Sequence, residues 1–132
     1  MNAKLSCSGN SIEIADFYHS KQDENNGNPY NCTFNIYIKS GSFSGCADGC
    51  DYDYKEWKKF VNHLKNVVLN KAEQAVLHEI GYGSKIVFTG DGIGHIQVSG
   101  IIFGQGKIHT LQFEFFTDQT FFADFIRELE CL

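Results

Sequence analysis

The stretch that decides the fold is CTFNIYIKSGSFSGCADGCDYDYKEWKKFVNHLKNVVL, residues 32–69. From Cys32 to Lys39 every second residue is apolar, which predicts a strand with one buried face. Ser40-Gly41 predicts a turn, after which 42–50 returns as an antiparallel partner. From about Asp53 to Leu69 the period changes from two to 3.6, which predicts an amphipathic helix. Its apolar stripe consists of Trp57, Phe60, Val61, Leu64, Val67 and Val68.

Further strands are predicted on both sides of this stretch. They cover 11–17, 75–80, 85–89, 95–102 and 108–116, whereas the polar run 21–28 predicts a loop. A final helix is predicted from Thr117-Asp118 onward, with Phe121, Phe122, Phe125, Ile126 and Leu129 as its apolar positions. We expect the core to be anchored by Trp57, Phe60, Leu64, Phe113, Phe115, Phe125 and Leu129.

These elements indicate one α+β domain that spans residues 1–132. Because tight turns join the strands, we expect a mostly antiparallel, curved sheet of about 6–8 strands. Two helices are expected to pack on one face of this sheet. The other face suits water or a partner, and we expect it to carry Thr33, Asn35, Tyr37, Gln97, Thr110, Gln112 and Glu114.

Composition excludes several classes of function. The formal net charge of -5 argues against a nucleic-acid partner, because phosphate contacts need a basic face, but it suits a basic protein partner. The chain has no apolar run of about 18 residues and no apolar signal core at its start, so we expect no membrane segment and a cytoplasmic location. Five cysteines, an odd number, predict free thiols.

The glycine cluster GDGIG, Gly90–Gly94, raises the possibility of a phosphate-binding loop. Such a loop leads from a strand into a helix, whose N-terminal N–H groups meet the anion. Here the alternating strand HIQVSG follows instead. The cluster therefore predicts a hairpin turn at Asp91-Gly92 and no nucleotide cofactor.

Two other groups of residues are candidates for chemistry. Cys46 and Cys50, four apart, are expected to share a strand face with Asp48, but no second cysteine pair completes a metal site. His95 and His109 fall on neighbouring predicted strands and can be imagined as an acid–base pair. Their predicted side chains face opposite ways, so we expect no catalytic residue, no metal and no cofactor.

The acidic segment Asp48–Glu56 (DGCDYDYKE) is the strongest candidate for a binding surface. Part of its charge is explained by capping of the helix that follows, through Asp51 or Asp53. Tyrosines in the same segment supply the amphipathic contact area that interfaces use. The expected partner-binding residues are Asp48, Asp51, Tyr52, Asp53, Tyr54 and Glu56.

Several motifs, in this order, are similar to a known family. They are FSG (43–45), WKKFVNHLKNV (57–67), GDGIGHIQVSG (90–100) and LQFEFFTDQTFFADFIRELECL (111–132). Over residues 41–132 the chain resembles the WapI-type bacterial immunity proteins and their uncharacterised relatives. The resemblance implies a non-enzymatic cytoplasmic protein that binds and neutralises a cognate toxin domain, often a nuclease. A small-molecule-binding domain that uses the polar sheet face is the alternative, and the oligomeric state stays open.

Overall fold

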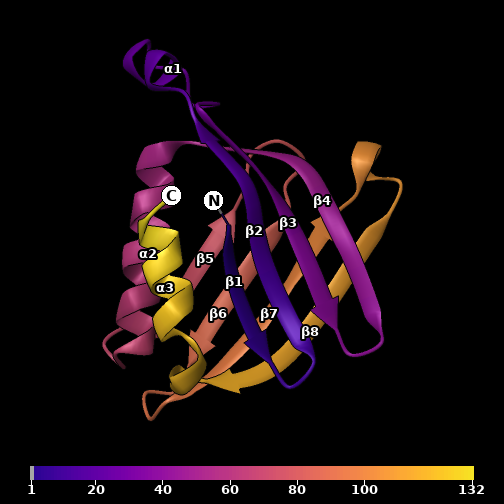
Figure 1. Ribbon diagram of the computed structural model, residues 1–132, viewed down its shortest axis with the longest axis vertical. Helices are drawn as coiled ribbons and strands as arrows, with labels where there is room; N and C mark the ends of the chain where they lie inside the picture. The colour runs from indigo at the N-terminus through magenta and orange to yellow at the C-terminus, as the bar shows by residue number, and fades with distance from the viewer. Residues whose placement is uncertain (1) are drawn as a thin grey trace.

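The computed structural model describes residues 2–132, and within them the chain forms strands, three α-helices and two short 3₁₀ turns (Figure 1). The strands are β1 (Ala3–Cys7), β2 (Asn10–His19), β3 (Cys32–Ser40), β4 (Phe43–Tyr52), β5 (Gln74–His78), β6 (Lys85–Gly90), β7 (His95–Phe103) and β8 (Thr110–Asp118). The helices are α1 (Lys21–Asn25), α2 (Tyr54–Val68) and α3 (Ala123–Glu130), and the turns are η1 (Gln105–Lys107) and η2 (Gln119–Phe121). The predicted α+β class and antiparallel pairing are confirmed.

The eight strands are divided between two sheets. The first has the order β1-β2-β3-β4 and the second the order β5-β6-β7-β8, and every pairing is antiparallel. Figure 1 shows one sheet lying in front of the other, with α2 and α3 together at one side. There α2 packs against β5 and β6, and α3 packs against β1. The helices thus cover the open side next to the edge strands β1 and β5. At the opposite side of the two sheets, β4 approaches β7 and β8.

One core fills the space between the sheets and under the helices. The predicted inward faces are confirmed for β3 and α2, and all seven predicted anchor residues are buried. Trp57 of α2 packs against Phe17 and Phe34 of the first sheet, and Phe60 continues to Phe88 of the second. Asp53 is the N-cap of α2, because its carboxylate accepts from the backbone N–H of Lys55. Helix α2 therefore joins the two sheets.

Two β-bulges interrupt the first sheet. In β2 the register shifts between Ala15 and Tyr18, where Asp16 has a φ of 55°, and in β4 it shifts beside Gly49, which has a φ of 62°. An extra residue reverses the alternation of side chains along a strand. For this reason Cys50 lies in the core whereas Cys46 lies on the outer face, and the expectation that they share a face is wrong.

Several elements differ from the sequence expectations. Strand β8 continues to Asp118, so α3 begins only at Ala123 and not at Thr117-Asp118. The run 21–28 is not entirely loop, since α1 forms one short helix there. The N-terminal strand β1 was not predicted. No helix of residues 2–132 is long and apolar enough to cross a membrane.

The GDGIG cluster forms the turn between β6 and β7, as predicted. Gly92 has a φ of 84°, and Asp91 accepts from the backbone N–H groups of Ile93 (2.9 Å) and His95 (3.1 Å). These hydrogen bonds hold the pKa of Asp91 below its usual value, and the bond from Ile93 contributes most. The glycines therefore shape a hairpin.

Candidate functional site

The acidic segment Asp48–Glu56 does not form one surface. It runs along β4, turns at Asp53 and enters α2, so its side chains point in several directions. Tyr52 is only 7% exposed and belongs to the core. Glu56 is exposed on α2 and pairs with Lys59 at 3.2 Å. Of the six expected residues, Asp48 and Asp51 alone lie on the outer face of the first sheet.

Asp53 and Tyr54 are engaged by other parts of the chain. The carboxylate of Asp53 accepts from Asn31 Nδ2 (3.3 Å) in addition to capping α2. The ring of Tyr54 stacks on His19, with 3.8 Å between ring centroids, and its hydroxyl donates to the Leu132 carbonyl (3.2 Å). These two residues hold neighbouring segments in place.

Asp51 lies beside a buried carboxylate. Its backbone N–H donates to Glu79 (3.1 Å), whose side chain is 1% exposed, and its carbonyl accepts from Ile80 N–H (2.7 Å). Partial burial, and secondly the charge of Glu79, raise the pKa of Asp51 above its ordinary 3.8.

Asp51→Asn is expected to stabilise the protein at neutral pH. Because the pKa is higher in the folded state, Asp51 favours folding when protonated and opposes it as pH rises through the folded pKa. The gain should be on the order of 0.5 kcal/mol at pH 7, the scale of a partly exposed charge pair, and should fade below about pH 4. Urea unfolding at pH 7 and pH 3 measures it. A gain of equal size at both pH values would contradict the raised pKa.

The outer face of the first sheet gathers carboxylates from several strands. Glu13 and Asp16 come from β2, and Asp48 and Asp51 come from β4. Within residues 2–132 none of these four forms an ion pair. Two exposed tyrosines lie among them, Tyr18 at 64% and Tyr37 at 42% exposure. A hollow of about 400 Å³ borders Tyr37 on this face, and Glu13 lines it together with Lys4 and Lys39.

The centre of this outer face is held by hydrogen bonds. Asn35 of β3 bridges both bulges, since its Nδ2 donates to Asp16 (3.0 Å) and its Oδ1 accepts from Gly49 N–H (2.9 Å). Cys46 Sγ donates to Asp48 (3.1 Å), and burial, followed by Asp48, raises the pKa of this thiol to about 11. Neighbouring Cys46 is also the main cause of the raised pKa of Tyr37, to which Asp16 and Asp48 add. Asp16 and Asp48 are therefore fixed in place on either side of β3.

The polar residues expected on one sheet face lie on two. Thr33, Asn35 and Tyr37 belong to the first sheet, whereas Gln97, Thr110, Gln112 and Glu114 belong to the second. Since the inner faces of both sheets meet in the core, these two groups point away from each other. The second group is neutral apart from Glu114, which bonds Gln97, and Gln97 lies opposite an exposed Phe116.

The residues considered for catalysis or metal binding are not assembled. His95 opposes Asp118 at one end of the β7–β8 pair, whereas His109 precedes Thr110 at the other. His95 contacts Asp91 instead, at 2.6 Å, in the exposed β6–β7 turn. Within residues 2–132 no group of three or more His, Cys, Asp or Glu residues is arranged to hold a metal ion.

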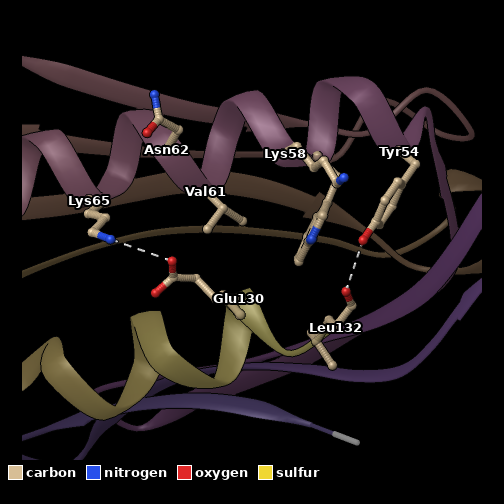
Figure 2. Close-up of a pocket in the computed structure, with 9 residues that line it drawn as sticks. Tyr54, Lys58, Val61, Asn62, Lys65, Glu130 and Leu132 are labelled. Atoms are coloured by element: carbon tan, nitrogen blue, oxygen red, sulfur yellow. Dashed lines mark hydrogen bonds and ion pairs between the residues drawn. The ribbon is translucent and has the colours of Figure 1, made fainter.

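A groove lies between α2 and α3 (Figure 2). Trp57, Val61 and Leu129 line it together with Lys58 and Asn62, and the Lys65–Glu130 ion pair (3.5 Å) spans it. Its volume of about 230 Å³ is below the roughly 300–1,000 Å³ of most ligand pockets. The small-molecule alternative concerns the polar sheet face instead, where a hollow of about 640 Å³ borders Gln112 and Glu114 of the second sheet.

Sequence reasoning missed Glu13, Asp16 and Tyr18 on the outer face. A signal for them exists in SIEIADFYH, where the apolar residues change from Ile12 and Ile14 to Ala15 and Phe17. That change from even to odd positions marks the bulge at Asp16 and turns Tyr18 outward. No such local signal shows that β2 and β4 lie on either side of β3.

The comparisons with known proteins give one match. The family described as the Immunity protein WapI-like family matches residues 7–132, more than the motifs at 41–132 had indicated. No curated protein and no solved structure matches the chain. Since the matched region is nearly the whole chain, the protein belongs to the WapI-like immunity protein family.

Proposed function

We propose that this chain binds and neutralises the cognate toxin domain of a polymorphic, contact-dependent toxin system, and that it does so in the cytoplasm without catalysing a reaction. The observation that carries the proposal is the family match over residues 7–132. The outer face of the first sheet adds support. Its unpaired carboxylates and exposed tyrosines are the side chains that a basic protein surface would complement.

A nuclease is the class of toxin that best fits this charge. Nucleases bind phosphate through cationic clefts, and an acidic protein can occupy such a cleft. Opposite charge also accelerates the encounter of two proteins at low salt. The proposed interface includes Asp48 and Asp51 of the acidic segment, with Asp16, Tyr18 and Tyr37 beside them.

Replacing Asp16, Asp48 and Asp51 together by Asn should slow association with the toxin about tenfold at low salt and flatten its salt dependence. Asn preserves the shape of each side chain and tolerates the positive φ of Asp16. The probe is the purified cognate toxin domain, to be identified from the genes that neighbour this chain's gene. Stopped-flow kinetics at several salt concentrations, together with protection of cells that express the toxin, provide the measurement.

The matched control removes the same number of charges from α3 through Asp124→Asn, Glu128→Gln and Glu130→Gln. If the charges on the outer face act locally, the control variant should slow association with the toxin much less than the Asp16, Asp48 and Asp51 variant does. Equal slowing by both triple variants would mean that net charge alone matters and that the interface lies elsewhere. If the unmodified chain neither binds nor protects, the proposed function is wrong.

A further inference from the structure

The connection between β2 and β3 is longer than the fold requires. Ser20 N–H donates to the Asn31 carbonyl (2.8 Å), one position beyond the paired His19 and Cys32. Strands this close can be joined by a two-residue turn. Instead residues 21–30, here named the arm, extend outward and include α1. Figure 1 shows α1 beyond the ends of the strands, away from the rest of the molecule.

The arm adds nothing to the core. Helix α1 has no buried residue, and the rest of the arm, Asn26–Tyr30, is exposed. A short helix that buries no apolar surface gains no stability from packing. The hydrophobic core therefore gives no reason for the arm.

The arm is nevertheless held firmly at its base. Asn31 is buried, and its amide donates to the Asn28 carbonyl (2.9 Å) while its Oδ1 accepts from Tyr54 N–H (2.7 Å). His19 stacks on Tyr54 and bonds Glu24 at 3.1 Å. The Ser20 hydroxyl caps α1 by accepting from Asp23 N–H (3.2 Å). A segment ordered before binding loses less conformational entropy when a partner arrives.

The exposed side chains of the arm are polar and carry a net charge of -1, from Lys21, Asp23 and Glu24. Lys21 is paired with Glu24, which leaves the carboxylate of Asp23 outside any ion pair in residues 2–132. Exposed amides surround it, and Tyr30 and Tyr18 flank the base with half or more of their surface exposed. A concave surface rich in basic groups complements these side chains.

We propose that the arm is inserted into a basic cleft of the toxin domain, and that Asp53, Tyr54 and His19 act as positioning residues that hold it. This inference rests on the proposed function and names the element that enters the partner. It also gives two members of the acidic segment a role through the arm, since Asp53 binds Asn31 and Tyr54 supports both Asn31 and His19.

The test replaces residues 21–30 by Asn-Gly, which closes Ser20 to Asn31 with a tight turn. Because the arm buries no apolar side chain and the Asn31 amide keeps Asp53 as a partner, the variant should unfold within a few degrees of the unmodified protein. Its Kd for the same cognate toxin domain, measured by titration calorimetry, should rise at least about tenfold. Two point variants refine the result, Tyr30→Ala in the arm and Ile108→Ala as an equally simple change in the β7–β8 connection, where Ile108 is exposed.

Weaker binding by the arm deletion and by Tyr30→Ala, with Ile108→Ala unchanged, supports the inference. An unchanged Kd for the folded deletion overturns it while the proposed function stands. If the deletion unfolds, Tyr30→Ala and Asp23→Asn decide, since neither residue is buried, and unchanged binding by both then overturns the inference. No binding by the unmodified chain overturns the proposed function and the inference together.

Discussion

Trp57→Ala is expected to lower the free energy of unfolding by about 3–5 kcal/mol, the usual cost of deleting a large buried side chain. The indole is 1% exposed and contacts three rings, those of Phe17, Phe34 and Phe60. It attaches α2 to the first sheet, and through Phe60 and Phe88 to the second. Its removal leaves a cavity at the junction of three elements.

Urea unfolding followed by far-UV circular dichroism measures the effect, because Trp57 is the only tryptophan and its removal abolishes the fluorescence probe. Trp57→Phe should cost less, since it retains a ring. Lys59→Ala, on the solvent-exposed face of α2, should change the free energy of unfolding by less than about 0.5 kcal/mol. A cost below about 1 kcal/mol for Trp57→Ala would contradict the packing described here.

Glu79→Ala should have an effect of similar size, about 3–5 kcal/mol, for a different reason. The buried carboxylate accepts four backbone N–H groups, and its loss leaves several of these donors without a partner at about 1–3 kcal/mol each. The donors are Asp51 (3.1 Å), Gly81 (2.6 Å), Tyr82 (3.0 Å) and Ser84 (2.8 Å). Glu79 thus organises the β5–β6 loop and connects it to β4.

Glu79→Gln removes the charge but keeps the size and shape of the side chain. One carboxylate oxygen is replaced by an amide nitrogen, which is a donor and cannot accept from the backbone N–H groups that face it. We expect an intermediate loss for this variant. Glu73→Ala, an exposed glutamate just before β5, is the control and should change stability by no more than about 0.5 kcal/mol. Chemical unfolding of the three variants under one set of conditions decides the matter. Equal stability of Glu79→Ala and Glu73→Ala would show that water replaces the carboxylate.

Residues with a local signal were predictable. The alternation of Cys32, Phe34, Ile36 and Ile38 and the 3.6 period around Trp57 define which side chains are buried, and the structure confirms both. Ala3, Leu5 and Cys7 alternate in the same way, so β1 could also have been recognised. Thr117-Asp118 misled the prediction, because Asp118 caps the 3₁₀ turn η2 and not the helix.

The candidate site was less accessible from sequence. Asp48–Glu56 is contiguous in the chain, yet Tyr52 enters the core, Asp53 and Tyr54 support the arm, and Asp48 joins Asp16 on the outer face. Proximity along the chain says little about a common surface when a strand, a cap and a helix follow one another. The face that carries Asp16 and Asp48 exists only because β2, β3 and β4 pair in this register.

The sequence by itself determined most of the elements, their antiparallel hairpins and most of the buried faces, because side-chain periodicity and turn chemistry act over a few residues. The tertiary structure alone decided that eight strands divide into two sheets, which separates Tyr37 from Gln97 and Glu114. It also decided the bulge at Gly49, which Asn35 joins to the one at Asp16, and the position of the arm. The physical reason is that strand pairing and sheet packing depend on contacts between residues far apart in the chain, and no local pattern encodes these.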